Sequence, residues 1–91
     1  MKYLRLPEWI LLAALRHALT QQSVIVSDVA ELVEHHLCYL TPATRKKMAQ
    51  EIGYALPGLD VQASPLDGYY HDIWRYLRGL LQRSLEEGCS D

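Results

Sequence analysis

Apolar residues recur along the chain with the three- and four-residue spacing of amphipathic helices. The clearest run follows Ser27 and consists of Val29, Leu32, Val33, His36, Leu37 and Leu40. Side chains at these intervals share one face of a helix with 3.6 residues per turn. The pattern predicts a helix with a buried face, capped at its N-terminus by Ser27 and continuing to about Leu40.

A second helix is predicted upstream of this one. Pro7 suits the first helical position, and the helix is expected to run to about Leu19. Its apolar residues cover nearly the whole circumference, which predicts that it is the central helix of the domain.

Two more helices are predicted in the second half of the chain. Thr41 is expected to cap a helix that starts at Pro42 and ends at the Pro57-Gly58 pair. After a connection, a last helix runs to about Glu87, with Ser64 as its cap or a restart at Asp67, and with Gly88 as its stop.

The segment Val24-Ile25-Val26 falls in the short connection between the first two predicted helices. We interpret Val24 and Val26 as apolar plugs packed where the two helices turn back on each other, with a very short β bridge at residues 24–26 as the alternative. The sequence therefore predicts an all-α fold, with four helices in a single domain over residues 1–91. The expected core is Leu11, Leu12, Leu15, Leu32, Leu37, Ile52, Trp74 and Leu77.

Composition and charge exclude only a few classes of function. With 49% apolar and 22% charged residues, the chain is typical of a globular domain, and its net charge of −2 gives no general attraction to nucleic acid or anionic lipid. The apolar run from Trp9 to Leu15 is too short to span a bilayer. Cys38 and Cys89 fit free thiols in a reducing compartment, so a bacterial cytoplasm is expected, although a Cys38–Cys89 bridge stays open.

No pattern of catalytic, cofactor-binding or metal-binding residues stands out. The chain contains no P-loop, GxGxxG, HExxH or nucleophile-elbow motif. His35, His36 and Cys38 invite a zinc interpretation, but adjacent helical residues point about 100° apart and no second ligand pair follows. We therefore expect no enzyme activity, no cofactor and no metal.

A run of three basic residues, Arg45-Lys46-Lys47, resembles the start of a DNA-recognition helix. A helix-turn-helix regulator is therefore the alternative function. Three consecutive residues fan widely around a helix, and the preceding acidic helix would repel phosphates. A solvated helix face explains the run better, and we expect no nucleic-acid partner and no membrane.

Two helix faces are candidates for binding a partner protein. The first is the acidic face Asp28, Glu31 and Glu34, which could mimic phosphates toward a nucleic-acid-binding protein. The second is a flank of the last helix, formed by Tyr69, Asp72, Tyr76, Gly79 and Arg83. Tyrosine and arginine are enriched at binding hot spots, and an interior glycine suggests close approach of a partner helix, from a second copy or a host protein.

The chain also resembles a group of small helical proteins encoded in tailed phages and prophages. Their core is similar to W-x-L-x-A-x-R-Y-A-L-G-R-x-T-Y-x-V-S, followed by an acidic helix, a segment like L-S-x-x-T-R and a late tryptophan. The matching residues here are Trp9, Leu12, Ala14, Arg16, Ala18, Leu19, Val26, Ser27, Glu31, Leu40, Thr44, Arg45 and Trp74. His17 replaces the group's tyrosine, and Thr20 its loop glycine. The resemblance implies a mobile-element origin and a helical fold, but no particular activity.

From these observations we expect a phage or mobile-element accessory protein that acts by protein–protein contact in the host cytoplasm. An inhibitor of a host defence system, similar to anti-CRISPR proteins, is the most concrete version. A host or phage protein, or a second copy bound through the last helix, would be the partner.

Overall fold

The chain folds into four α-helices. The computed structural model describes residues 5–21, 23–61 and 65–89, and within these it leaves the side-chain surroundings of residues 59–61 and 65–68 undescribed. The helices are α1 (Glu8–Gln21), α2 (Ile25–His35), α3 (Pro42–Val61) and α4 (Pro65–Glu87), and the short 3-10 helix η1 (Leu37–Tyr39) lies between α2 and α3. The described residues contain no strand, so the expected all-α fold of four helices is confirmed and the β bridge at residues 24–26 is wrong.

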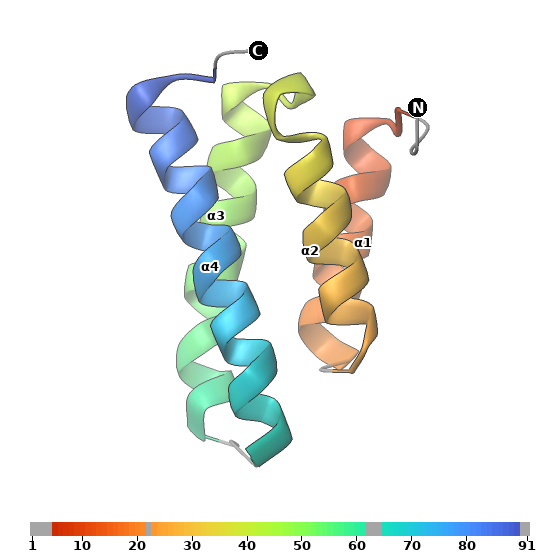
Figure 1. Cartoon of the computed structure of the whole chain (residues 1–91), viewed down its shortest axis with the longest axis vertical. Coiled ribbons are helices and arrows are strands. Elements are labelled where there is room, and N and C mark those ends of the chain that lie inside the picture. Colours follow the sequence, from red (N-terminus) through yellow and green to blue (C-terminus); the bar gives the residue numbers. More distant parts are fainter. Residues whose placement is uncertain (1–4, 22, 62–64, 90–91) are drawn as a thin grey trace.

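Successive helices alternate in direction, so that α1 and α3 run one way and α2 and α4 the other (Figure 1). Each helix packs on two others: α1 on α2 and α3, and α4 on the same two. The expectation that the first helix is central is therefore wrong. Leu11, Leu15 and Ala18 of α1 are buried, but Trp9 is 72% exposed, because no described segment covers the opposite side of the helix. No helix in the described part of the chain is long and apolar enough to cross a bilayer.

The start of α2 differs from the expectation. Ser27 does not cap this helix; α2 begins two residues earlier, at Ile25, without a side-chain cap, and the Val26 N–H donates to the Ser23 carbonyl at 2.9 Å. Val26 is fully buried, whereas Val24 is 76% exposed and is not a plug. Burying a valine contributes about 1.5–3 kcal/mol, which outweighs the helix-propensity cost of up to about 0.7 kcal/mol for a β-branched residue.

The end of α2 also differs, because the helix stops at His35 and not at about Leu40. His36 leaves the helical conformation and its ring is buried. Ring atom Nδ1 lies 2.8 Å from the Leu32 carbonyl, and Nε2 accepts the Leu6 N–H at 3.0 Å. Since a carbonyl only accepts, the ring hydrogen sits on Nδ1. The histidine thus satisfies a carbonyl at the helix end and holds the segment before α1.

Helix α3 continues through Pro57 to Val61, so the predicted stop at Pro57-Gly58 is wrong. An interior proline removes one backbone hydrogen bond and costs about 3 kcal/mol. Packing against a neighbouring helix is what stabilises most helices in proteins, and α3 packs extensively on α4. The predicted cap Ser64 lies outside the described residues, and α4 begins directly after it, at Pro65.

A single hydrophobic core fills the space between the helices. Five predicted core residues are buried: Leu11, Leu15, Ile52, Trp74 and Leu77. The other three, Leu12, Leu32 and Leu37, are half-buried and pack against the edge of the core. The helical periodicity therefore identified the side of each helix that faces the core, although it did not distinguish residues at the centre of the core from residues at its edge.

The two cysteines are joined. Cys38 in η1 forms a disulfide with Cys89, just past the end of α4, with 5.4 Å between the Cα atoms. The expectation of free thiols is wrong, because the bundle brings η1 beside α4 although 51 residues separate the two cysteines.

The N-terminus of α3 is capped from two sides. The Thr44 N–H donates to the Thr41 hydroxyl at 3.3 Å, which confirms Thr41 as the cap. The Glu8 carboxylate, from the first turn of α1, accepts the Thr44 hydroxyl and also the Thr41 N–H, the latter at 2.7 Å. These hydrogen bonds hold the pKa of Glu8 below its ordinary value because they favour the charged carboxylate, and the bond from the Thr44 hydroxyl has the largest effect.

A second polar link joins α1 to α3 further along. The Arg16 guanidinium donates through Nε and Nη2 to the Glu51 carboxylate at 2.7–2.9 Å. This is the two-pronged geometry that suits arginine and carboxylate. The hydrogen bonds from Arg16 lower the pKa of Glu51. Both links fix the position of α1 along α3.

We predict that Leu77→Ala lowers the free energy of unfolding by about 2–5 kcal/mol, because Leu77 is fully buried. Leu80→Ala, three residues along α4 at a half-buried position, is the control and should cost less. Urea denaturation measures both. Equal losses would contradict the orientation of α4.

We predict that Glu8→Gln makes stability less dependent on pH in acid. The pKa of Glu8 is lowered on folding, so its carboxylate stabilises the fold at pH values above the ordinary pKa of 4.5. This stabilisation is lost as the pH falls through the pKa of the folded state. Between about pH 5 and pH 3 the wild type should lose more stability than Glu8→Gln. Glu86→Gln, at an exposed position, is the control for loss of a charge, and urea midpoints at both pH values are the measurement.

Candidate functional site

The two predicted partner-binding faces lie next to each other. Helices α2 and α4 pack side by side and run in the same direction (Figure 1). The Tyr76 hydroxyl on α4 donates a hydrogen bond to the Glu34 carboxylate on α2 at 2.7 Å. This bond joins the acidic face to the flank of the last helix. We call the joint surface the α2–α4 face; it consists of Asp28, Glu31, Glu34, Tyr69, Asp72, Tyr76, Gly79 and Arg83.

The side chains of this face are open to solvent. Tyr69 is 61% and Tyr76 is 53% exposed, and every other member is exposed except the half-buried Gly79. The Tyr69 ring also meets the ring of half-buried Tyr70 edge-on, with 5.5 Å between centroids. The tyrosines of the flank therefore present apolar ring surface outside the core.

Carboxylates dominate the charge of the face. It carries four carboxylates and one guanidinium. Two of the carboxylates have contacts within their own helices, Asp72 with Arg75 at 3.4 Å and Glu31 with His35 at 3.9 Å. Asp28 is exposed near the start of α2. A basic surface is therefore the electrostatic complement of this face.

The Tyr76–Glu34 hydrogen bond changes the acidity of the tyrosine. The bond to the Glu34 carboxylate raises the pKa of Tyr76, because loss of the phenolic proton would break the bond and leave two anions side by side. Tyr76 therefore stays a hydrogen-bond donor that links α4 to α2.

Gly79 lies on this face, and nothing within the described part of the chain occupies the space beside it. A Cβ atom built on Gly79 would meet no atom within 4 Å. The fold itself therefore does not require glycine here, although glycine costs about 1 kcal/mol relative to alanine inside a helix. The close approach predicted from the sequence is not made by another part of the described chain.

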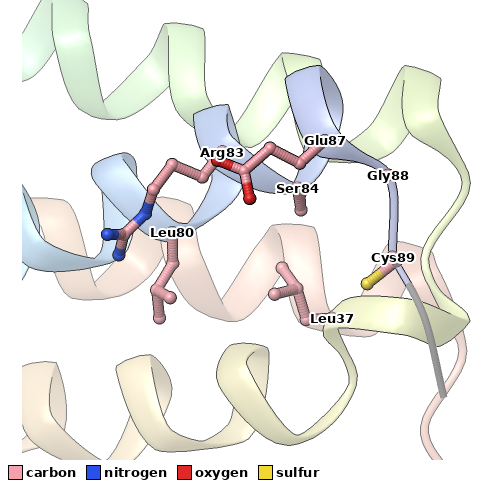
Figure 2. A pocket seen from close by; sticks show the side chains of 7 residues that line it. All are labelled: Leu37, Leu80, Arg83, Ser84, Glu87, Gly88 and Cys89. Atoms are coloured by element: carbon pink, nitrogen blue, oxygen red, sulfur yellow. The ribbon is translucent and has the colours of Figure 1, made fainter.

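Arg83 lies at the end of the face and borders a pocket of about 430 Å³ between α4 and η1. Figure 2 shows Leu80 of α4 and Leu37 of η1 extending into this space, with Gly88 and Cys89 at one end of it. The residues that line it are Leu37, Leu80, Arg83, Ser84, Glu87, Gly88 and Cys89. The sequence did not predict this pocket, because its two walls come from segments far apart in the chain.

The basic run at the start of α3 is divided by the fold. Lys46 and Lys47 are exposed, but Arg45 is only 7% exposed and donates a hydrogen bond to the Ser84 carbonyl at 3.1 Å. Cations at helix C-termini interact favourably with the carbonyl groups there. The prediction that all three lie on a solvated face is wrong for Arg45, which supports the end of α4.

The residues considered for metal binding do not come together. His35 lies on the exposed side of α2, the His36 ring bonds to backbone groups, and Cys38 is in the disulfide. In the described parts of the chain, no three His, Cys, Asp or Glu side chains form a metal-binding group.

A second surface hollow, which the sequence did not predict, lies between α1 and α3. It has a volume of about 410 Å³ and is lined by Arg16, Leu19, Thr20, Glu51, Tyr54 and Ala55. Tyr54 is 81% exposed beside the Arg16–Glu51 ion pair. Arg16 and Leu19 belong to the motif of the phage-protein resemblance, which is the sequence signal at this place.

Comparisons with protein-family models, with curated proteins and with solved structures find no match for this chain. The geometry of the α2–α4 face is therefore the observation that bears on function.

We predict that Glu34→Gln lowers the pKa of Tyr76 toward its ordinary value, because the neutral amide no longer favours the protonated phenol. The titration is followed by NMR of the tyrosine ring. Glu31→Gln is the matched control on the same helix and should leave the titration of Tyr76 unchanged. An unchanged pKa in Glu34→Gln would contradict the hydrogen bond.

Proposed function

We propose that this protein is a non-enzymatic accessory protein of a phage or mobile element and that it acts by binding another protein through the α2–α4 face. The Tyr76–Glu34 hydrogen bond is the observation that carries the proposal, because it joins the acidic face and the tyrosine flank into one exposed surface. Exposed tyrosines give large contact area at little cost in conformational entropy, and carboxylates around them give electrostatic specificity.

The chemistry of the face favours a basic partner. Its carboxylates would take the place of nucleic-acid phosphates on a nucleic-acid-binding host protein, and its tyrosines would pack against apolar parts of that surface. An inhibitor of a host defence system, comparable to anti-CRISPR proteins, is the concrete form of this proposal, with the bacterial cytoplasm as its location. The mobile-element origin rests on the resemblance described above.

The DNA-binding alternative gains no observation in its favour. Arg45 contacts Ser84 and is buried, which leaves Lys46 and Lys47 as the exposed pair of the basic run. A protein that contacts several phosphates binds DNA with a steep dependence on salt. Binding measured at about 50 mM and 200 mM salt therefore distinguishes a regulator from the proposed inhibitor.

We predict that Tyr76→Ala and Gly79→Ala both weaken partner capture while leaving the protein folded. Tyr76 is more than half exposed, so its loss spares the core. An added methyl group at Gly79 has space in the isolated chain and should raise helix stability by up to about 1 kcal/mol, but it would obstruct a closely packed partner. Tagged protein is used to capture binders from host lysate, and thermal unfolding is measured in parallel.

Tyr54→Ala is the matched control, because Tyr54 is an exposed tyrosine on α3, away from the face. It should capture the same proteins as the wild type. The proposal fails if all three variants capture equally, or if the captured protein is acidic and does not bind nucleic acid. Self-association lost in the Tyr76 and Gly79 variants, measured by sedimentation, would instead indicate a homodimer through α4.

A further inference from the structure

The disulfide joins two peripheral segments of the bundle. Cys38 lies in η1, which has no buried residue, and its side chain is exposed, whereas Cys89 is half-buried. Only Gly88 separates Cys89 from the last residue of α4, and its φ of 80° turns the chain away from the helix axis. Within the described residues, no hydrogen bond joins Gly88 or Cys89 to η1. Among the described residues, the sulfur–sulfur bond is therefore the polar or covalent link that holds Gly88 and Cys89 against η1.

The segments on either side of η1 are anchored independently of this bond. His36, just before η1, is bonded through its ring to the Leu6 N–H and lies against the Leu32 carbonyl. Thr41, just after it, donates its N–H to Glu8. These contacts do not involve either cysteine. Loss of the disulfide would therefore free residues 88–89 and let the last turn of α4 fray. The helix η1 would keep its hydrogen bonds to His36 and its packing on the core through Leu37.

We propose that the Cys38–Cys89 bond is a redox clasp, which thiol reductants open. Gly88 and Cys89 form one side of the pocket of about 430 Å³ between α4 and η1, and Leu37 and Leu80 extend into it (Figure 2). Opening the clasp removes that side of the pocket and uncovers the two leucines.

The opening follows ordinary thiol–disulfide exchange. A thiolate of the reductant attacks Sγ of Cys38, the more exposed of the two residues, and forms a mixed disulfide while Cys89 leaves as a thiolate. A second reductant thiolate attacks the reductant sulfur of the mixed disulfide and releases the Cys38 thiolate, so that the reductant leaves as its own disulfide. Two electrons pass from the two reductant thiols to the protein disulfide, and the two protons that those thiols lost are taken up by the two cysteine thiolates.

The clasp also borders the proposed binding surface, because Arg83 belongs both to the α2–α4 face and to the pocket. Opening would change the surroundings of this guanidinium and so tune partner binding. This consequence rests on the proposed function, whereas the clasp itself does not.

Hydrogen exchange of the full chain, followed by mass spectrometry with and without dithiothreitol, tests the clasp. Reduction should speed exchange about tenfold or more in residues 85–89, and it should leave η1 and the buried parts of α3 and α4 protected. The double variant Cys38→Ser/Cys89→Ser is the matched control and should exchange like the reduced protein in both conditions. Neither measurement needs a partner, so its outcome is separate from that of the proposed function.

Three outcomes would overturn the clasp. Alkylation of both cysteines in the oxidised protein without reductant would show that no bond forms. Unchanged exchange on reduction would show that the bond restrains no segment. Loss of protection in all helices, or failure of the double variant to fold, would show that the bond stabilises the whole fold. As a second measurement, glutathione should be found on Cys38 and not on Cys89 after brief exposure; the reverse would contradict the proposed order of attack.

Discussion

Burial of one stripe of α4 is the constraint on which the rest of the structure depends. Trp74, Leu77 and Leu81 are all completely buried between the other helices. Once this stripe points inward, the positions of the two flanks of α4 are fixed. One flank brings Tyr76 to α2. The other places the Arg78 side chain over Gly53 of α3, and a Cβ atom added to Gly53 would lie 3.2 Å from the Arg78 guanidinium. The exposed face and the tight α3–α4 contact are both consequences of that orientation.

Helical periodicity was sufficient to predict the four helices and most of the core, because each helix buries a continuous stripe. It failed at helix ends, where small local preferences compete with packing. A serine cap contributes about 1 kcal/mol, so it did not prevail over burial of Val26, and the local cost of Pro57 did not stop α3. His36 ended α2 through contacts with Leu6, which lies thirty residues away in sequence. No local pattern encodes such a contact.

In the candidate site too, local features could be predicted from the sequence, whereas contacts between distant segments could not. Exposure of the two predicted faces followed from the positions of their residues on each helix, but their union through Tyr76 and Glu34 depends on which helices are neighbours. The burial of Arg45 beside Ser84 and the Cys38–Cys89 bond have the same origin. The local sequence predicts a surface charge for Arg45 and a thiol for each cysteine, because the partners of these residues lie 39 and 51 residues away.

Links between distant segments gather at one end of the bundle, where the starts of α1 and α3, the helix η1 and the end of α4 meet (Figure 1). They are Glu8 with Thr41 and Thr44, Leu6 with His36, Arg45 with Ser84, and the disulfide. The disulfide is the one link of this set that chemistry can break without acid or denaturant. Because the others hold the same helices, breaking it alters the surface around Leu37 and Leu80 and leaves the core closed. A covalent bond placed among redundant contacts can therefore act on a binding surface without acting on the fold.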